Sequence, residues 1–173
     1  MAQALTRIPG KTEDAAAPTP SVAKLSSLTL RGVEGVAIQY AKCCRPIPGD
    51  AVVGQFRRGQ GLLVHTRDCV TLKKQHVDAS ELVDVEWAPD VQGVFETGIR
   101  LLVADRRGLL AQLATAVADA DANIDQVSME RPDGDEVLAM FFGVQVRDRR
   151  HLAQVLRSLR HIPEVKRAQR ART

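Results

Sequence analysis

The sequence predicts an α+β protein, in which a small antiparallel β-rich module is followed by a ferredoxin-like βαββαβ domain. Residues 31–90 hold short segments of alternating polarity together with all three cysteines. Residues 94–173 follow the order strand, helix, strand, strand, helix, strand. That order is typical of a four-stranded antiparallel sheet packed under two helices. Turn-forming residues at Pro89-Asp90 and Gly93 separate the two parts.

The first part follows residues 1–30, which are rich in Ala, Thr, Ser and Pro and have no sustained apolar period. That composition predicts a disordered linker. Gly59 and Gly61 permit the positive φ angles of a tight hairpin turn, and Asp68 is a good N-cap for a short helix. The expected elements are a strand over 36–40, a turn over 46–50, strands over 52–56 and 61–65, a helix over 69–74 and a strand over 82–87.

The second part alternates between the period of strands and that of helices. In its second helix, Asp148 is the predicted N-cap, apolar residues form one stripe, and Pro163 ends the helix. The expected elements are a strand over 99–103, a helix over 109–117, a strand over 123–129, a turn over 131–134, a strand over 138–146, a helix ending at 159 and a strand over 165–168.

The bulk composition is that of a soluble globular protein. A chain of 173 residues accommodates one medium domain or two small ones. No apolar run approaches the roughly 20 residues of a membrane span, and the N-terminus lacks the pattern of a signal peptide. We therefore expect a cytoplasmic protein, in which three cysteines indicate free thiols, a metal site or a redox sensor before they indicate disulfides.

The charge is unevenly distributed, although the net charge is only +3. Residues 147–173 carry nine basic and two acidic side chains, and residues 42–74 carry seven basic and two acidic ones. Two basic zones indicate a polyanionic partner or, alternatively, two solvated faces. Because only 3% of the residues are aromatic, stacking on single-stranded RNA is disfavoured, and phosphate contacts to folded RNA fit better.

Cys43, Cys44, His65 and Cys69 supply the four donors that a tetrahedral zinc site needs. Neighbouring side chains diverge on an extended backbone, so Cys43 and Cys44 can both bind one ion only if the following prolines force a turn. Three interpretations stay open: a zinc site, metal-free thiols that pack or hydrogen-bond, and a redox sensor. A catalytic thiolate paired with His65 is a further alternative, but no orienting Asn or nucleophile signature accompanies it.

Three motifs stand out: Cys43-Cys44-Arg45-Pro46-Ile47-Pro48-Gly49-Asp50, His65-Thr66-Arg67-Asp68-Cys69 and Asp105-Arg106-Arg107-Gly108-Leu109-Leu110. Together they resemble the conserved-cysteine, zinc-finger-like module and the ACT domain that close long RelA/SpoT-homologue proteins. Those proteins make and hydrolyse (p)ppGpp in the stringent response. The resemblance implies a regulatory region with no activity of its own, zinc as the candidate cofactor, and a parent protein that is a GTP/GDP diphosphokinase and (p)ppGpp 3'-pyrophosphohydrolase.

The resemblance also implies partners: ribosomal RNA and tRNA on the ribosome, the parent's catalytic domains, a branched-chain amino acid, and a second copy bound through the ACT domain. The candidate RNA-binding residues come from the two basic zones and are Arg57, Arg58, Lys73, Lys74, Arg147, Arg149, Arg150 and Arg167. The residues implied for the amino acid are Asp105, Arg106, Arg107, Gly108, Leu109, Asn123 and Ile124, in two places that face one another across a domain interface in amino-acid-binding ACT domains.

The residues implied for the amino acid offer partners for both of its charged groups. Free N–H groups at the helix start near Gly108 attract a carboxylate, while Asp105 and Asn123 offer acceptors to an amino group. Alternatively, Gly108 only allows close packing and Asp105 only caps the helix. A different functional class is a freestanding amino-acid-sensing or metal-binding adaptor, and a third is a cysteine-dependent transferase or redox protein.

Overall fold

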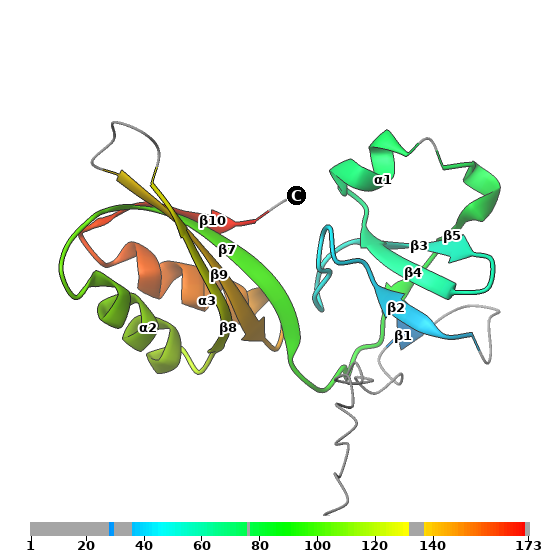
Figure 1. Cartoon of the computed structure of the whole chain (residues 1–173). Coiled ribbons are helices and arrows are strands. Elements are labelled where there is room, and N and C mark those ends of the chain that lie inside the picture. Colours follow the sequence, from blue (N-terminus) through cyan, green and yellow to red (C-terminus); the bar gives the residue numbers. More distant parts are fainter. Residues whose placement is uncertain (1–27, 30–35, 76, 132–136, 172–173) are drawn as a thin grey trace, which may run out of the picture.

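The computed structural model describes residues 28–29, 36–75, 77–131 and 137–171. Within them, two four-stranded sheets lie in two domains connected by residues 88–94 (Figure 1). Residues 28–87 are termed the cysteine module and residues 95–171 the βαββαβ domain. The predicted α+β class, with a β-rich module before a ferredoxin-like domain, is confirmed.

The cysteine module is built on a sheet with the strand order β2-β4-β3-β5. β3 and β4 form the predicted antiparallel hairpin. Gly61, at its turn, has a φ of 87°, and a Cβ atom there would lie 2.2 Å from the Ala37 carbonyl oxygen, so that only glycine fits. The elements are β1 (Leu28–Thr29), β2 (Ile38–Tyr40), β3 (Val52–Arg57), β4 (Gly61–Thr66), α1 (Val70–Lys74), the 3₁₀ turn η1 (Ala79–Glu81), β5 (Leu82–Asp84) and β6 (Glu86–Trp87).

Strand pairing in the module differs from the expectation in two ways. β2 runs parallel to β4. The chain reverses direction between β2 and β3 and again between β3 and β4, so that β2 and β4 point the same way. The strand expected over 82–87 is divided at the buried Val85: β5 pairs with β3, whereas β6 pairs with β1. β1 falls inside the segment expected to be linker, most of which lies outside the described residues.

The start of α1 also differs. Its N-cap is Cys69 and not Asp68, and the Cys69 sulfur accepts a hydrogen bond from the Leu72 amide at 3.5 Å. Asp68 still belongs to the turn after β4, which the Cys69 amide closes by donating to the Thr66 carbonyl at 3.0 Å. The helix therefore begins one residue later than predicted.

The βαββαβ domain has the antiparallel strand order β10-β7-β9-β8, with both helices on one face of the sheet (Figure 1). α2 starts after Gly108, which has a φ of 80° and makes no side-chain cap, so Asp105 does not cap this helix. Asp148 caps α3 as predicted, since its Oδ1 accepts from the His151 amide at 2.7 Å. The elements are β7 (Phe95–Ala104), α2 (Leu109–Asp119), β8 (Asn123–Glu130), β9 (Val137–Val146), α3 (Arg149–Arg160) and β10 (Val165–Arg170).

The main core lies between this sheet and its two helices. Ile99 and Phe142 from the strands and Leu113 and Leu159 from the helices are fully buried there. Ile47 of the cysteine module belongs to the same core and has no exposed surface, so the two domains share apolar packing. None of the described helices is long and apolar enough to cross a membrane.

Candidate metal centre and ligand sites

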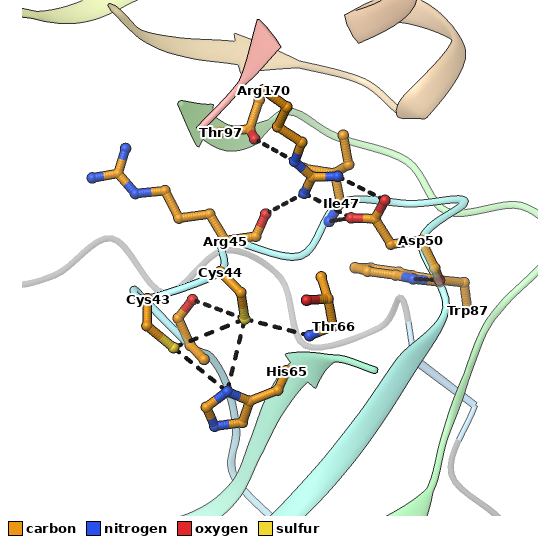
Figure 2. A network of polar contacts seen from close by, with 11 residues as sticks. Cys43, Cys44, Arg45, Ile47, Asp50, His65, Thr66, Trp87, Thr97 and Arg170 are labelled. Atoms are coloured by element: carbon orange, nitrogen blue, oxygen red, sulfur yellow. Dashed lines mark hydrogen bonds and ion pairs between the residues drawn. The ribbon is translucent and has the colours of Figure 1, made fainter. Parts of the chain in front are cut away.

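The four predicted metal ligands come from three places in the cysteine module and lie together. Cys43 and Cys44 follow β2, His65 belongs to β4, and Cys69 caps α1. The chain turns at the two adjacent cysteines, because the Arg45 amide donates to the Ala41 carbonyl at 2.8 Å and Arg45 adopts a φ of 42°. This turn brings both thiols to the side of His65 (Figure 2).

Four of the six distances between the donor atoms are close to those of a tetrahedron around one ion. Cys43 Sγ lies 3.9 Å from Cys44 Sγ and 3.6 Å from Cys69 Sγ. His65 Nδ1 lies 3.5 Å from Cys43 Sγ and 3.7 Å from Cys44 Sγ, and all four donor atoms lie within 4.8 Å of one another. Two thiolates that each bind a tetrahedral zinc at about 2.3 Å are roughly 3.8 Å apart, so the residues present fit zinc.

Backbone amides point at two of the sulfurs. The Thr66 amide donates to Cys44 Sγ at 3.3 Å, and the Leu72 amide donates to Cys69 Sγ at 3.5 Å. Hydrogen bonds from N–H groups favour the negative form of the acceptor. These hydrogen bonds orient the two sulfurs, and the one to Cys44 favours its thiolate form.

Burial acts in the opposite direction on the thiols. It raises the pKa of Cys43, and it raises the pKa of Cys44 to about 12. Burial also lowers the pKa of His65, to which the charge of Arg57 contributes, so the imidazole is held neutral as a metal ligand must be. Thiols held in the protonated form are poor nucleophiles, which disfavours the catalytic-thiolate alternative.

The orientation of His65 identifies its ligand atom. The ring is buried, and Nδ1 faces the sulfurs, whereas Nε2 has no hydrogen-bond partner among the described residues. In many metal sites the second ring nitrogen donates to a neighbouring acceptor, and the described residues supply none here. Nδ1 is therefore the atom that would bind the ion.

The residues predicted for the amino acid are divided between opposite ends of the sheet. Asp105 and Gly108 follow the end of β7, near Arg131, which forms an ion pair with Asp105. Asn123 begins β8 and pairs with Gln145 at the end where β7 starts. One chain therefore does not bring Asp105 and Asn123 together. Next to Asp105, the Arg106 guanidinium hydrogen-bonds to Glu164 and lowers the pKa of that carboxyl.

The residues predicted for RNA binding lie on several elements of both domains. Arg57 and Arg58 are at the turn of the hairpin, whereas Lys73 and Lys74 end α1, which follows the other end of β4. In the βαββαβ domain, Arg149 and Arg150 begin α3 and Arg167 lies on β10, all with exposed side chains. Arg147 is paired with Asp121 at 2.5 Å.

Sequence reasoning missed the contacts at the domain junction. Arg170 and Asp50 form an ion pair there, and a cavity of about 450 Å³ lies beside it, with Cys44, Arg67 and Leu152 in its wall. The available signal was the apolar Ile47 between two prolines, in a segment interpreted only as a turn. Its partners in the core all belong to the second domain, from Ile99 onward, so local patterns did not reveal them.

Comparisons with known proteins identify both parts of the chain. Residues 28–88 match the RelA/SpoT RIS domain, and residues 92–170 match an ACT domain. The chain belongs to the RelA/SpoT family. The predicted resemblance is thereby confirmed, and the two parts are named the RIS domain and the ACT domain below.

Two curated relatives show the extent of the similarity. The bifunctional (p)ppGpp synthase/hydrolase SpoT of Escherichia coli is 34% identical over 152 residues, which cover 88% of this chain and 21% of that protein. The bifunctional (p)ppGpp synthase/hydrolase RelA of Mycobacterium tuberculosis is 34% identical over 138 residues, covering 80% of this chain and 19% of that protein. The chain thus spans about a fifth of the length of the curated relatives it matches.

Among solved structures, the ACT domain from the GTP pyrophosphokinase of Chlorobium tepidum is 22% identical. The alignment covers 46% of this chain and 89% of that one, with a TM-score of 0.40.

Proposed function

We propose that the chain is the regulatory part of a bifunctional (p)ppGpp synthetase/hydrolase of the stringent response. In this role it senses the ribosome with its tRNA, and a branched-chain amino acid, and relays the signal to the catalytic domains of the parent protein. The observation that carries the proposal is the 34% identity to SpoT over 88% of the chain, through both the RIS and the ACT domain. The fragment itself is not catalytic in this proposal.

The cysteine cluster holds a structural zinc ion in the proposal. Cys43, Cys44 and Cys69 would bind it through sulfur and His65 through Nδ1. Zinc bound by four protein ligands contributes folding energy and keeps no open position for a substrate. The ion would thus fix the turn after β2 against β4 and α1.

The exposed basic residues would contact ribosomal RNA and tRNA. Among the described residues, no side chain forms an ion pair with those of Arg58, Lys73, Lys74, Arg150 or Arg167. Their charges are therefore available to an external polyanion, and phosphate is the group that arginine and lysine bind most generally in nucleic acids.

The amino-acid site would form between two copies of the ACT domain. Asp105 and Asn123 lie at opposite ends of one sheet, and β8 is its edge strand. If two β8 strands pair in antiparallel fashion, Asn123 of one copy approaches Asp105 of the other. The half-exposed Val127 and Met129 on β8 give this edge an apolar surface that a second copy would cover.

A native mass spectrum of the 173-residue chain tests the binding part of the proposal in one measurement. We expect one zinc ion per chain, a dimer, and additional mass from valine or isoleucine added at millimolar concentration. Binding to ribosomes that carry uncharged tRNA, compared with empty ribosomes, tests the sensing part. A chain that binds neither ribosomes nor an amino acid would reject the sensing role while leaving its family membership intact.

A further inference from the structure

The loop between β2 and β3 belongs to both domains. Residues 43–50, termed the docking loop, begin with two of the four candidate metal ligands, Cys43 and Cys44. The rest of the loop lies against the ACT domain (Figure 2). Arg45, the residue next to Cys44, is itself held by the second domain, because its carbonyl accepts a hydrogen bond from Arg170.

Arg170 at the end of β10 holds both ends of this segment. Its Nη1 and Nη2 donate to the two carboxylate oxygens of Asp50, each at 2.7 Å, and Nη2 also donates to the Arg45 carbonyl at 2.8 Å. Its Nε donates to Thr97 Oγ1 within the ACT domain at 3.1 Å, which orients the guanidinium. The side chains of Arg170 and Asp50 are 18% and 8% exposed, so the pair is screened little by water.

Asp50 also fixes the loop internally. Its Oδ2 accepts from the Ile47 amide at 2.9 Å, and its own amide donates to the Ile47 carbonyl at 3.0 Å. The Asp50 carbonyl accepts from Trp87 Nε1 at 3.1 Å. The carboxylate, amide and carbonyl groups of Asp50 therefore all form hydrogen bonds, either within the turn or with Arg170 and Trp87.

Apolar and backbone contacts complete the docking. Ile47 is buried in the ACT core, and the Pro48 carbonyl accepts from the Arg149 amide at 2.9 Å. Gly49, with a φ of 91°, approaches Arg149 so closely that a Cβ atom would lie 3.2 Å from the Arg149 Cβ. The loop is therefore positioned by the ACT domain at four consecutive residues, from Ile47 to Asp50.

We propose that the ACT domain is part of the scaffold of the metal centre, and that Arg170 is a positioning residue for the ligands Cys43 and Cys44. The inference rests on the proposed metal binding. Metal binding and docking of the two domains then stabilise each other, because both need the same conformation of the docking loop. Such coupling is reciprocal: loosening the dock weakens metal binding, and removing the metal loosens the dock.

The first experiment measures zinc affinity by competition with a chromogenic chelator. Arg170→Ala and Arg170→Lys are compared with Arg167→Ala, an exposed arginine on the same strand. We expect Arg170→Ala to weaken zinc binding roughly 10- to 100-fold, the range found for residues that position metal ligands. Arg170→Lys keeps the charge but loses the two-pronged contact, so its zinc affinity should lie between that of the wild type and that of Arg170→Ala. Arg167→Ala should bind zinc like the wild type.

The second experiment needs no substitution and reads the dock directly. The Arg149 amide, at the first position of α3, has no partner in its own helix and donates to Pro48 of the RIS domain. Its hydrogen exchange should become faster when a chelator removes zinc. The His151 amide, which donates to Asp148 within the ACT domain, should not change and is the matched control.

The outcomes separate the inference from the proposal beneath it. A wild-type protein that binds no zinc rejects the metal centre and the inference together. One zinc per chain, with equal affinity in Arg170→Ala and the wild type, rejects the inference alone. If Arg170→Ala does not fold, the zinc affinity of Arg170→Lys and the hydrogen exchange of the Arg149 amide decide. An exchange rate of the Arg149 amide that does not depend on zinc overturns the coupling.

Discussion

Arg170 and Asp50 are 120 residues apart in the sequence and form a two-pronged, largely buried ion pair across the junction of the two domains. The pair joins the loop that carries two candidate metal ligands to the last strand of the ACT sheet. Removing one partner of a buried pair leaves the other charge without compensation, and that cost exceeds what the intact pair contributes.

Replacing Arg170 with Ala should lower the free energy of unfolding by about 3 kcal/mol, because the largely buried Asp50 carboxylate then loses its charged partner. Urea unfolding followed by the fluorescence of Trp87, the single tryptophan, measures the change at the junction itself. Arg147→Ala is the control, since its pair with Asp121 is exposed and should contribute less than about 1 kcal/mol. Equal losses in the two variants would show that the junction pair contributes no more to the free energy of unfolding than an exposed pair does.

Removing zinc should lower the thermal stability of the RIS domain, because an ion that binds only the folded state stabilises that state. Thermal unfolding with and without a chelator measures the effect. Cys44→Ser and His65→Ala should unfold at a temperature that no longer depends on the chelator. His161→Ala removes an exposed histidine outside the cluster and should keep the dependence. A wild-type protein insensitive to the chelator would favour metal-free thiols.

Mixing two defective ACT variants should restore amino-acid binding. Asp105→Ala and Asn123→Ala should each abolish the heat of valine binding in calorimetry. In a one-to-one mixture, half of the dimers are mixed and each has one intact site, so roughly a quarter of the wild-type sites should return. No recovery on mixing, although each variant dimerises, would contradict a site shared between copies.

Binding to ribosomal RNA should weaken steeply as salt rises. With about five phosphate contacts, log K should fall by four to five units for a tenfold rise in salt, taking the coefficient for duplex DNA as a guide. The double variant Arg58→Ala, Lys74→Ala should reduce this slope by up to about two units. Arg147→Ala, which removes one charge already paired with Asp121, is the control and should change the slope by clearly less than about one unit, the share of one charge in the double variant. A slope unchanged by the double variant would exclude these residues from the interface.

Alanine at the two glycines of the β3–β4 turn should have different costs. Both glycines have positive φ, which costs a residue with a side chain about 1 kcal/mol or more. At Gly59 a Cβ atom meets nothing within 4 Å, whereas at Gly61 it would lie 2.2 Å from the Ala37 carbonyl oxygen. Gly61→Ala should therefore destabilise by at least about 1 kcal/mol more than Gly59→Ala, as urea unfolding would show. Equal costs would mean that the backbone of residue 37 moves away freely.

The sequence alone determined most of the local structure. The alternation of apolar residues predicted the strands of both domains, and the apolar stripe after Asp148 predicted α3 together with its cap. These patterns are local, because the side-chain period of a strand or helix and the partner of an N-cap depend on residues a few positions away. The same motifs were sufficient to identify the family and to select the four residues of the cysteine cluster.

Tertiary structure decided what depends on distant partners. The sequence left open whether Cys43 and Cys44 could face one ion, and the turn closed by the Arg45 amide shows that they do face His65. Local patterns gave no sign that β1 pairs with β6, and the apolar Ile47 gave no sign of which domain it packs into. The reason is physical: pairing and packing partners are chosen among all surfaces of the folded chain, whereas a sequence pattern reports only which face a residue prefers to bury.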